Sequence, residues 1–176
     1  MKRIIKKVLK KIESQGYEAF IVGGYVRDYL LDKESFDIDI CTNALPDTIK
    51  NIFKKYITKE NYGCISFKIK DYSFDITTYR KEIKYNKRKP TQLEYVDNLD
   101  EDIIRRDFTI NSICMDYKGY IIDIYDGIND LSNKEIKMIG DVDQKIKEDP
   151  LRILRTIRFA CTLNFNINSD LEDSIK

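Results

Sequence analysis

Residues 20–40 read FIVGGYVRDYLLDKESFDIDI, and this stretch decides the fold. An apolar run ends in two glycines, a short segment of helical character follows, and a second run alternates between apolar and acidic residues. The pattern predicts a strand over 17–22, a short helix over 25–31 and a strand over 36–40. Asp37 and Asp39 stand two residues apart on the second strand, so both carboxylates point to the same face.

This carboxylate pair is a candidate metal site. Two acidic groups held close together repel each other unless one is protonated or a cation lies between them. Oxygen ligands of this kind favour Mg²⁺, which takes its remaining ligands from water and substrate phosphates. An isolated Asp-x-Asp pair is more often the polar outer face of an edge strand, so the interpretation depends on its surroundings.

The glycine pair supplies those surroundings. Gly23 and Gly24 let the backbone approach a bulky anion, and the helix that follows offers free N–H groups to it. Arg27, about one turn into this helix, reaches the same place. A glycine pair alone often marks only a tight bend, but a phosphate cradle shortly before a carboxylate pair is a much stronger signal.

Composition narrows the chemistry. The 176 residues are 42% apolar and 35% charged, which is typical of a globular domain with a real core. Because the chain has no histidine, a Ser–His or Cys–His relay and a His-ligated zinc site are excluded. Lys outnumbers Arg 22 to 9, yet six arginines are concentrated in three short segments, where a ligand is expected: Arg27, Arg105, Arg106, Arg152, Arg155 and Arg158.

The compartment is predicted from what the sequence lacks. Neither an eighteen-residue apolar window nor a signal peptide is found, so we expect no membrane contact and a cytoplasmic protein. The four cysteines form no CxxC pair, and we expect buried, reduced thiols at Cys41, Cys64, Cys114 and Cys161.

Outward from the glycine pair, strands dominate the first 125 residues and helices the rest, which predicts an α+β fold. Residues 2–15 form an amphipathic helix whose six basic residues favour a solvated face over RNA contact. The basic stretch 81–90 is predicted to be a loop, either mobile or touching RNA. A long helix is predicted over 150–163, with the following side chains packed against the protein: Ile153, Leu154, Ile157, Ala160 and Cys161.

Four ordered motifs carry a family resemblance. GGYVRDYLLDKESFDIDI (23–40), RRDFTIN (105–111), DIYDGINDL (123–131) and EDPLR (148–152) resemble the signatures of class II CCA-adding tRNA nucleotidyltransferases and bacterial poly(A) polymerases. These enzymes belong to the DNA polymerase beta-like superfamily. The resemblance implies a nucleotidyltransferase head with a mixed sheet over residues 1–139 and the start of a helical neck over 140–176. The body and tail of such enzymes are absent, so we expect a fragment or a naturally short protein that binds tRNA weakly.

The resemblance also implies roles for individual residues. Asp37 and Asp39 would hold two Mg²⁺ ions, while Gly23, Gly24 and Arg27 would contact the triphosphate of CTP or ATP. The remaining nucleotide contacts would come from Arg106, Asp107, Asn111, Asp149, Arg152, Arg155 and Arg158. Within this set, Asp107 and Asn111 would face the sugar and exclude deoxyribose. Asp75 stands where similar enzymes often carry glutamate, and its shorter side chain leaves open whether it helps with the metal or the RNA 3′-OH.

Base selection by Asp149 and Arg152 is physically sensible. Asp149 accepts hydrogen bonds and Arg152 donates them, so together they match the amino group and neighbouring acceptor of cytosine and adenine. Guanine and uracil reverse that pattern, and the pair therefore selects C and A without a template. The competing interpretation is structural: Asp149 caps the start of the helix, and the arginines form a solvated face.

The predicted function is CCA addition to the tRNA 3′ end. The RNA 3′-OH attacks the α-phosphorus and pyrophosphate leaves. Polyadenylation and CC-only or A-only addition share this core. A catalytically silent nucleotide- or RNA-binding module is an alternative of a different class, and transfer to a protein or small molecule is a third.

Overall fold

A computed structural model describes residues 1–61, 63–86 and 89–176 of the chain. In these residues a seven-stranded mixed sheet forms the centre of the fold, with strand order β3-β4-β5-β2-β1-β8-β9. Only β2 and β5 run parallel, and the other neighbours are antiparallel. The strands are β1 (Ala19–Val22), β2 (Asp37–Thr42), β3 (Ile57–Asn61), β4 (Cys64–Ile69), β5 (Tyr72–Thr78), β8 (Cys114–Met115) and β9 (Ile121–Ile122). The predicted α+β class is confirmed.

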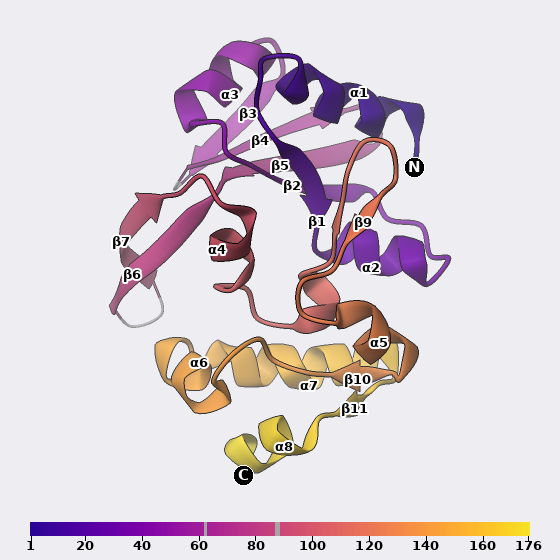
Figure 1. Cartoon of the computed structure of the whole chain (residues 1–176), viewed down its shortest axis with the longest axis vertical. Coiled ribbons are helices and arrows are strands. Elements are labelled where there is room, and N and C mark those ends of the chain that lie inside the picture. The colour runs from indigo at the N-terminus through magenta and orange to yellow at the C-terminus, as the bar shows by residue number, and fades with distance from the viewer. Residues whose placement is uncertain (62, 87–88) are drawn as a thin grey trace.

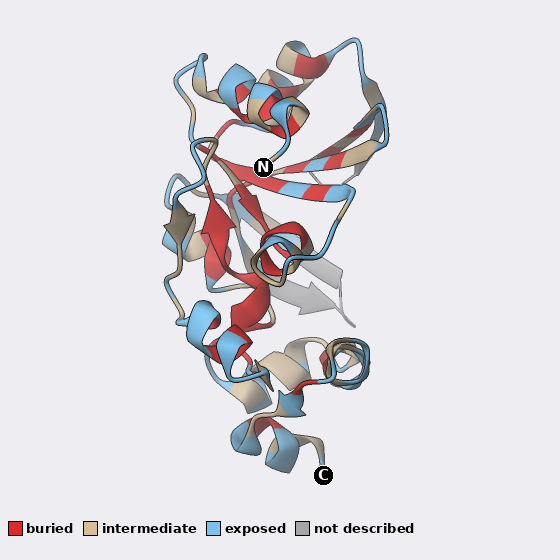
Figure 2. Cartoon of the chain, turned by 90° about the vertical axis from the view of Figure 1, so that its right-hand side faces the viewer, coloured by how far each residue is buried: buried red, intermediate tan, exposed pale blue. Residues whose placement is uncertain are grey.

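Helices α1 (Arg3–Glu13) and α3 (Pro46–Phe53) lie together on one side of the sheet (Figure 1). The apolar face of α1 joins apolar strand residues in one core cluster, so the predicted amphipathic helix is confirmed. Figure 2 shows the buried residues concentrated in the central strands and the elements that pack on them. Helix α2 (Gly24–Leu30) follows β1 directly and buries Tyr25, Val26 and Arg27.

The predicted loop over 81–90 is wrong. Strands β6 (Arg80–Asn86) and β7 (Lys89–Tyr95) pair as an antiparallel ribbon, and residues 87 and 88 of the predicted loop lie outside the described residues. A two-stranded ribbon outside the main sheet leaves much of its surface in water, so its sequence need not alternate apolar and polar residues. Strand β3 was also not predicted.

The second half of the chain is mostly helical and lies below the sheet in Figure 1, except for its first helix, which packs against the sheet. Its helices are α4 (Leu99–Ile103), α5 (Gly127–Ser132), α6 (Val142–Glu148), α7 (Leu151–Leu163) and α8 (Ser169–Ile175), with a 3-10 turn at Thr109–Asn111. Strands β10 (Glu135–Ile136) and β11 (Asn166–Ile167) pair in parallel beside α7. A second core cluster joins Phe108, Ile110 and Met138 to Phe165 and Leu171. Within the described residues, no helix has the length and apolar character needed to cross a membrane.

The packing predicted for α7 is wrong on one side. Leu154 and Ile157 are 62% and 45% exposed, whereas Arg152 and Thr156 on the arginine side are buried. The helical period tells which residues share a face, but not which face the rest of the chain covers. For the thiols, Cys41 and Cys114 are buried as predicted, Cys64 is half-buried, and the prediction for Cys161 is wrong because it is exposed. All four cysteines are free.

The DIYDGINDL stretch fixes the 3-10 turn in place. The Asp123 carboxylate accepts hydrogen bonds from the backbone N–H groups of Gly127 and Ile128, both at 2.8 Å, and so caps α5. Thr109 Oγ1 donates to Asp130 Oδ2 at 2.6 Å. A Cβ added at Gly127 would lie only 2.3 Å from the backbone oxygen of Thr109. Helix α5 therefore packs closely on the turn that carries Asn111.

Replacing Gly127 with alanine tests this packing. Alanine raises helix propensity by about 1 kcal/mol, but its methyl group forces two backbone segments apart. We expect Gly127→Ala to lower the free energy of unfolding by about 1–3 kcal/mol, measured by urea denaturation. Asn129→Ala, at an exposed position of the same helix, is the control. Equal stability of the two variants would contradict the close contact.

Candidate active site

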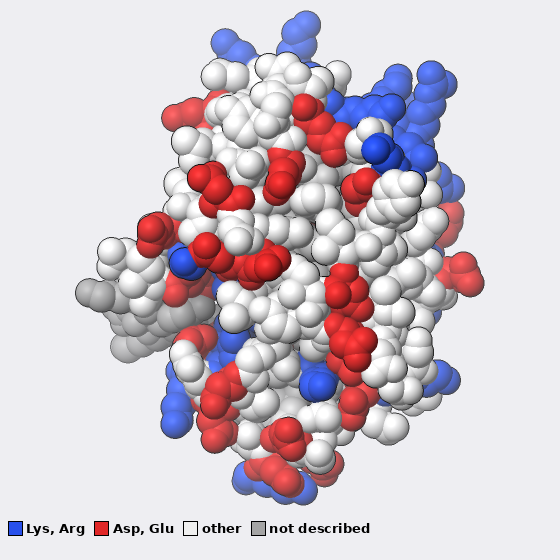
Figure 3. Space-filling model, viewed as in Figure 1, with Lys and Arg blue, Asp and Glu red and all other residues white. Residues whose placement is uncertain are grey.

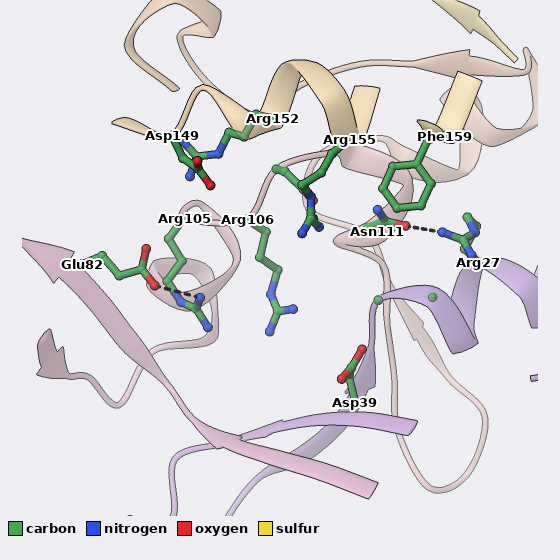
Figure 4. A pocket seen from close by; sticks show the side chains of 13 residues that line it. Arg27, Asp39, Glu82, Arg105, Arg106, Asn111, Asp149, Arg152, Arg155 and Phe159 are labelled. Atoms are coloured by element: carbon green, nitrogen blue, oxygen red, sulfur yellow. Dashed lines mark hydrogen bonds and ion pairs between the residues drawn. The ribbon is translucent and has the colours of Figure 1, made fainter. Parts of the chain in front are cut away.

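A cavity of about 450 Å³ lies between the sheet and α7. Side chains from both layers point into it, with α7 above and β2 below in the close view (Figure 4). Its lining is Gly23, Gly24, Arg27, Asp39, Glu82, Arg105, Arg106, Asp107, Asn111, Asp149, Arg152, Arg155 and Phe159. Ten of the thirteen residues predicted for the site are in this lining, although they come from segments far apart in the sequence.

The glycine turn lies against the carboxylate of Asp39, one of the two predicted metal ligands. Strands β1 and β2 pair so that Val22 lies opposite Asp39, which brings the turn after β1 beside the Asp39 side chain. Gly23 has φ +79°, and a Cβ there would lie 3.1 Å from Asp39 Oδ2. A side chain at position 23 would therefore be strained and would crowd the carboxylate. The glycine turn and the Asp39 carboxylate therefore lie side by side, as the sequence pattern predicts.

Three carboxylates share the sheet face that looks toward this turn. Asp37 and Asp39 alternate with buried Ile38 on β2, and Asp75 lies opposite Asp39 on the parallel neighbour β5. Partial burial raises the pKa of the Asp39 carboxyl, Arg106 lowers it, and Asp75 and Asp37 raise it again, with a net increase. Loss of contact with water is therefore the main cause of the raised pKa of Asp39, and the charges of Asp75 and Asp37 add to it.

The three carboxylates do not form a complete metal cage. In the described part of the chain, no group of three or more carboxylate, thiol or imidazole side chains is arranged to hold a metal ion. Of the three, only Asp39 belongs to the cavity lining, while Asp37 and Asp75 lie on the strands beside it. A cation at this face would need further ligands, and a bound polyphosphate would supply them.

Arg27 is held rigidly at the edge of the cavity. Its Nη1 donates to Asn111 Oδ1 at 2.8 Å, and its Nε and Nη2 donate to Asp28 Oδ1 at 2.9 and 2.7 Å. The guanidinium also lies 5.3 Å from the ring centroid of Phe159. Three of its five N–H groups are used in this way, and two remain for a ligand.

Buried Asp102 holds two arginines in place. Its Oδ1 accepts from Arg105 Nε and Nη2, and its Oδ2 accepts from Arg106 Nη2 at 2.8 Å. Burial alone would raise the pKa of Asp102, but the charges and hydrogen bonds of Arg106 and Arg105 outweigh it and lower the pKa. Arg105 also contacts Glu82, at 3.4 Å. Arg106, by contrast, points from its anchor toward Asp39 (Figure 4).

The arginines of α7 differ in what they contact. Arg152 is buried, and its Nη1 donates to the Lys145 backbone oxygen at 2.5 Å and to Glu148 Oε2 at 3.1 Å. Arg155 forms an ion pair with Asp107 at 2.5 Å. Arg158, predicted for the nucleotide pocket, is outside the cavity lining and lies 4.8 Å from the Phe159 ring centroid.

Three lining residues had no assigned role in the predicted site: Glu82, Arg105 and Phe159. Glu82 stands in the segment expected to be a loop. Arg105 is adjacent to the predicted Arg106, and the double arginine was a usable signal. Phe159 follows Arg158 and has the appearance of an ordinary core residue in the sequence, although its ring contacts two guanidinium groups.

Comparison with known proteins identifies the family. Residues 19–137 match the family model of the poly A polymerase head domain. The chain belongs to the poly A polymerase head domain family. This confirms the family resemblance found in the four sequence motifs.

Individual relatives of the family agree with this assignment. The chain is 43% identical over 171 residues to the CCA-adding enzyme of Lactobacillus helveticus (strain DPC 4571), covering 96% of this chain and 43% of that protein. It is 44% identical over 173 residues to the CCA-adding enzyme of Staphylococcus haemolyticus (strain JCSC1435), covering 97% and 43%. The chain therefore spans less than half the length of these relatives.

Solved structures of the family show the same fold. The Bacillus stearothermophilus CCA-adding enzyme in complex with CTP matches with a TM-score of 0.88 and 33% identity, over 99% of this chain and 43% of that one. A tRNA nucleotidyltransferase complexed with a primer tRNA and an incoming ATP analog matches with a TM-score of 0.79 and 32% identity, over 96% and 48%.

The Asp39 carboxylate is expected to destabilise the free protein. Because its folded-state pKa is raised, ionisation works against folding at neutral pH, and this penalty disappears as the pH falls through the raised pKa. We expect Asp39→Asn to raise the free energy of unfolding by about 0.5 kcal/mol, a small value because solvent screens this open side chain. The corresponding rise in Tm is about 1–2 °C without divalent ions, measured by calorimetry at pH 7.

Asp71→Asn, exposed in the turn between β4 and β5, is the control and is expected to leave Tm unchanged. A lower Tm for Asp39→Asn than for the wild type would show that the carboxylate is stabilised by its surroundings, contrary to this description.

Proposed function

We propose that the chain provides the catalytic and nucleotide-binding part of an enzyme that adds C and A from CTP and ATP to the 3′ end of tRNA. The observation that carries the proposal is the contact between the glycine turn and Asp39, within a cavity lined by arginines. Anchored cations and backbone N–H groups suit a triphosphate, and the carboxylates beside them suit the cations that accompany it. The relatives named CCA-adding enzyme support the same activity.

Two Mg²⁺ ions would be held by Asp37 and Asp39. The fit rests on the three carboxylates that share this face and on the incomplete ligand set that a triphosphate would complete. Burial, together with the charges of Asp75 and Asp37, raises the pKa of Asp39. When bound, such ions activate the attacking hydroxyl and stabilise the entering and leaving oxygens of an in-line displacement. Asp75, opposite Asp39, would add negative charge to the same face rather than a third ligand.

The triphosphate would lie against the turn at Gly23 and Gly24. The absence of a Cβ at Gly23 leaves room for phosphate oxygens beside Asp39. Arg27 would donate its two remaining N–H groups, and Arg106 would offer donors that Asp102 does not use. Because both guanidinium groups are held by buried partners, little side-chain entropy would be lost on binding.

The sugar and the base would be recognised from the helical layer. Asn111 uses its side-chain oxygen for Arg27, which leaves its NH₂ group to donate to a ribose hydroxyl, and Asp107 lies nearby with Arg155. Asp149 would accept from the amino group of cytosine or adenine, while Arg152 would donate to the neighbouring ring nitrogen. Glu148 and the Lys145 carbonyl fix one end of the Arg152 fork and leave the other free.

Nucleotide addition to tRNA lacking its terminal CCA distinguishes the related activities. We expect CTP alone to add C and stop, and ATP to be used only after C has been added, measured on sequencing gels. Repeated addition from ATP alone would indicate polyadenylation, and arrest after C with both nucleotides would indicate CC-only addition.

The double variant Asp37→Asn/Asp39→Asn is the matched control. It is expected to slow addition by about a thousand-fold or more, because several kcal/mol of charge stabilisation are lost. CTP binding by Arg152 and its neighbours should remain measurable by calorimetry. Addition close to the wild-type rate, or no addition by the wild type from any nucleotide, would overturn the proposal.

A further inference from the structure

The positive charge of the chain is concentrated at its start. Residues 1–12 contain no acidic residue and carry six basic ones, namely Lys2, Arg3, Lys6, Lys7, Lys10 and Lys11. The whole chain has a net charge of only +1, so residues 13–176 together carry −5. A chain with this balance has no general affinity for polyanions, and local concentration of charge must create any such affinity.

The fold places these cations on one outer surface. Helix α1 buries Ile5, Val8, Leu9 and Ile12 against the sheet, which leaves Arg3 and Lys7 exposed on its outer side. Lys11 instead reaches the backbone oxygen of Ile52. Figure 3 shows Lys and Arg gathered over this helix, at the upper right of the molecule. Because the apolar face is already used in the core, α1 cannot insert that face into a lipid bilayer. What α1 offers to a partner is charge alone.

An aromatic cavity of about 200 Å³ adjoins the start of α1. Its rings are Tyr25 and Tyr29, nearly parallel with centroids 6.4 Å apart, and Phe36 and Tyr72, with centroids 5.5 Å apart. Tyr29 and Phe36 are 45% and 48% exposed. Lys2 lines this cavity and also precedes α1 directly, so the basic surface and the aromatic cavity are continuous.

We propose that the outer face of α1 and this aromatic cavity form an RNA-binding surface. The cations of α1 contact the phosphate backbone, and an unpaired base stacks on the exposed rings of Tyr29 and Phe36. Neither an acidic protein surface nor an anionic membrane offers a planar base for these rings, whereas RNA supplies both groups. The inference rests on the proposed function, with tRNA as the RNA.

Charge reversal on α1 tests the phosphate contacts. Arg3→Glu/Lys7→Glu changes two exposed residues of α1, and the control Lys59→Glu/Lys68→Glu makes the same change in net charge on β3 and β4. Binding of fluorescent tRNA lacking its CCA end is measured by anisotropy from 50 to about 300 mM salt, without nucleotide. We expect the α1 variant to bind about tenfold or more weakly and its log–log salt slope to fall by about 1.5, since two phosphate contacts are lost. The control should change affinity less than about twofold.

The base contact is tested at Tyr29. Tyr29→Ala should weaken binding about fivefold or more, and Tyr29→Phe should restore it, because stacking needs the ring and not the hydroxyl. Equal effects of the two charge-reversal pairs, or an unchanged affinity of both α1 and Tyr29 variants, would overturn the proposal. The proposal would also be overturned if the α1 variant lost binding to anionic lipid vesicles but kept its binding to tRNA.

CTP binding separates this inference from the proposed function. The α1 variant should bind CTP as the wild type does, since its changes lie on the side of the sheet away from the nucleotide cavity. If the wild type bound tRNA through α1 but added no nucleotide, the proposed function would fail while the RNA-binding surface remained.

Discussion

The contact between Gly23 and the Asp39 carboxylate is the constraint on which the site depends. Antiparallel pairing of β1 and β2 sets Val22 opposite Asp39, so the turn that follows β1 must pass over the carboxylate. Gly23 has φ +79°, and a Cβ there would lie 3.1 Å from Asp39 Oδ2, so a side chain at position 23 would be strained and would crowd the carboxylate. The same short loop therefore brings together backbone N–H groups that suit phosphate and a carboxylate that suits a metal ion.

The remaining groups of the cavity are arranged around that contact by ion pairs and hydrogen bonds. Asp102 anchors Arg105 and Arg106, Asn111 anchors Arg27, and the Lys145 carbonyl anchors Arg152. Each anchor accepts hydrogen bonds from some N–H groups of its arginine and leaves others for a ligand. The guanidinium group is therefore held in one orientation and can still bind. Asp39 is the exception, because burial, and after it the neighbouring carboxylates, raise its pKa. At neutral pH the site thus holds an unfavourable charge in the free protein, and a bound cation would relieve it.

Sequence reasoning succeeded where one local pattern determines geometry. Alternation on β2 placed Asp37 and Asp39 on one face, and the glycine pair predicted the turn beside them. It failed where tertiary packing determines which residues are buried or reach the cavity. The period of α7 grouped Leu154 with Ile157, but only the fold shows that this face is exposed and that Arg152 is buried. Glu82 reaches the cavity because residues 80–95 form a ribbon, and their composition gave no period from which to predict it.

Mn²⁺ binding, measured by electron paramagnetic resonance with and without CTP, tests the central claim most directly. On our proposal, the carboxylates and the triphosphate share a metal ion beside Gly23. The wild-type chain with CTP bound should then bind Mn²⁺ about tenfold or more tightly than CTP alone binds it. Asp39→Asn should abolish that increase. Equal Mn²⁺ affinity in the wild type and Asp39→Asn, each with CTP bound, would contradict the account.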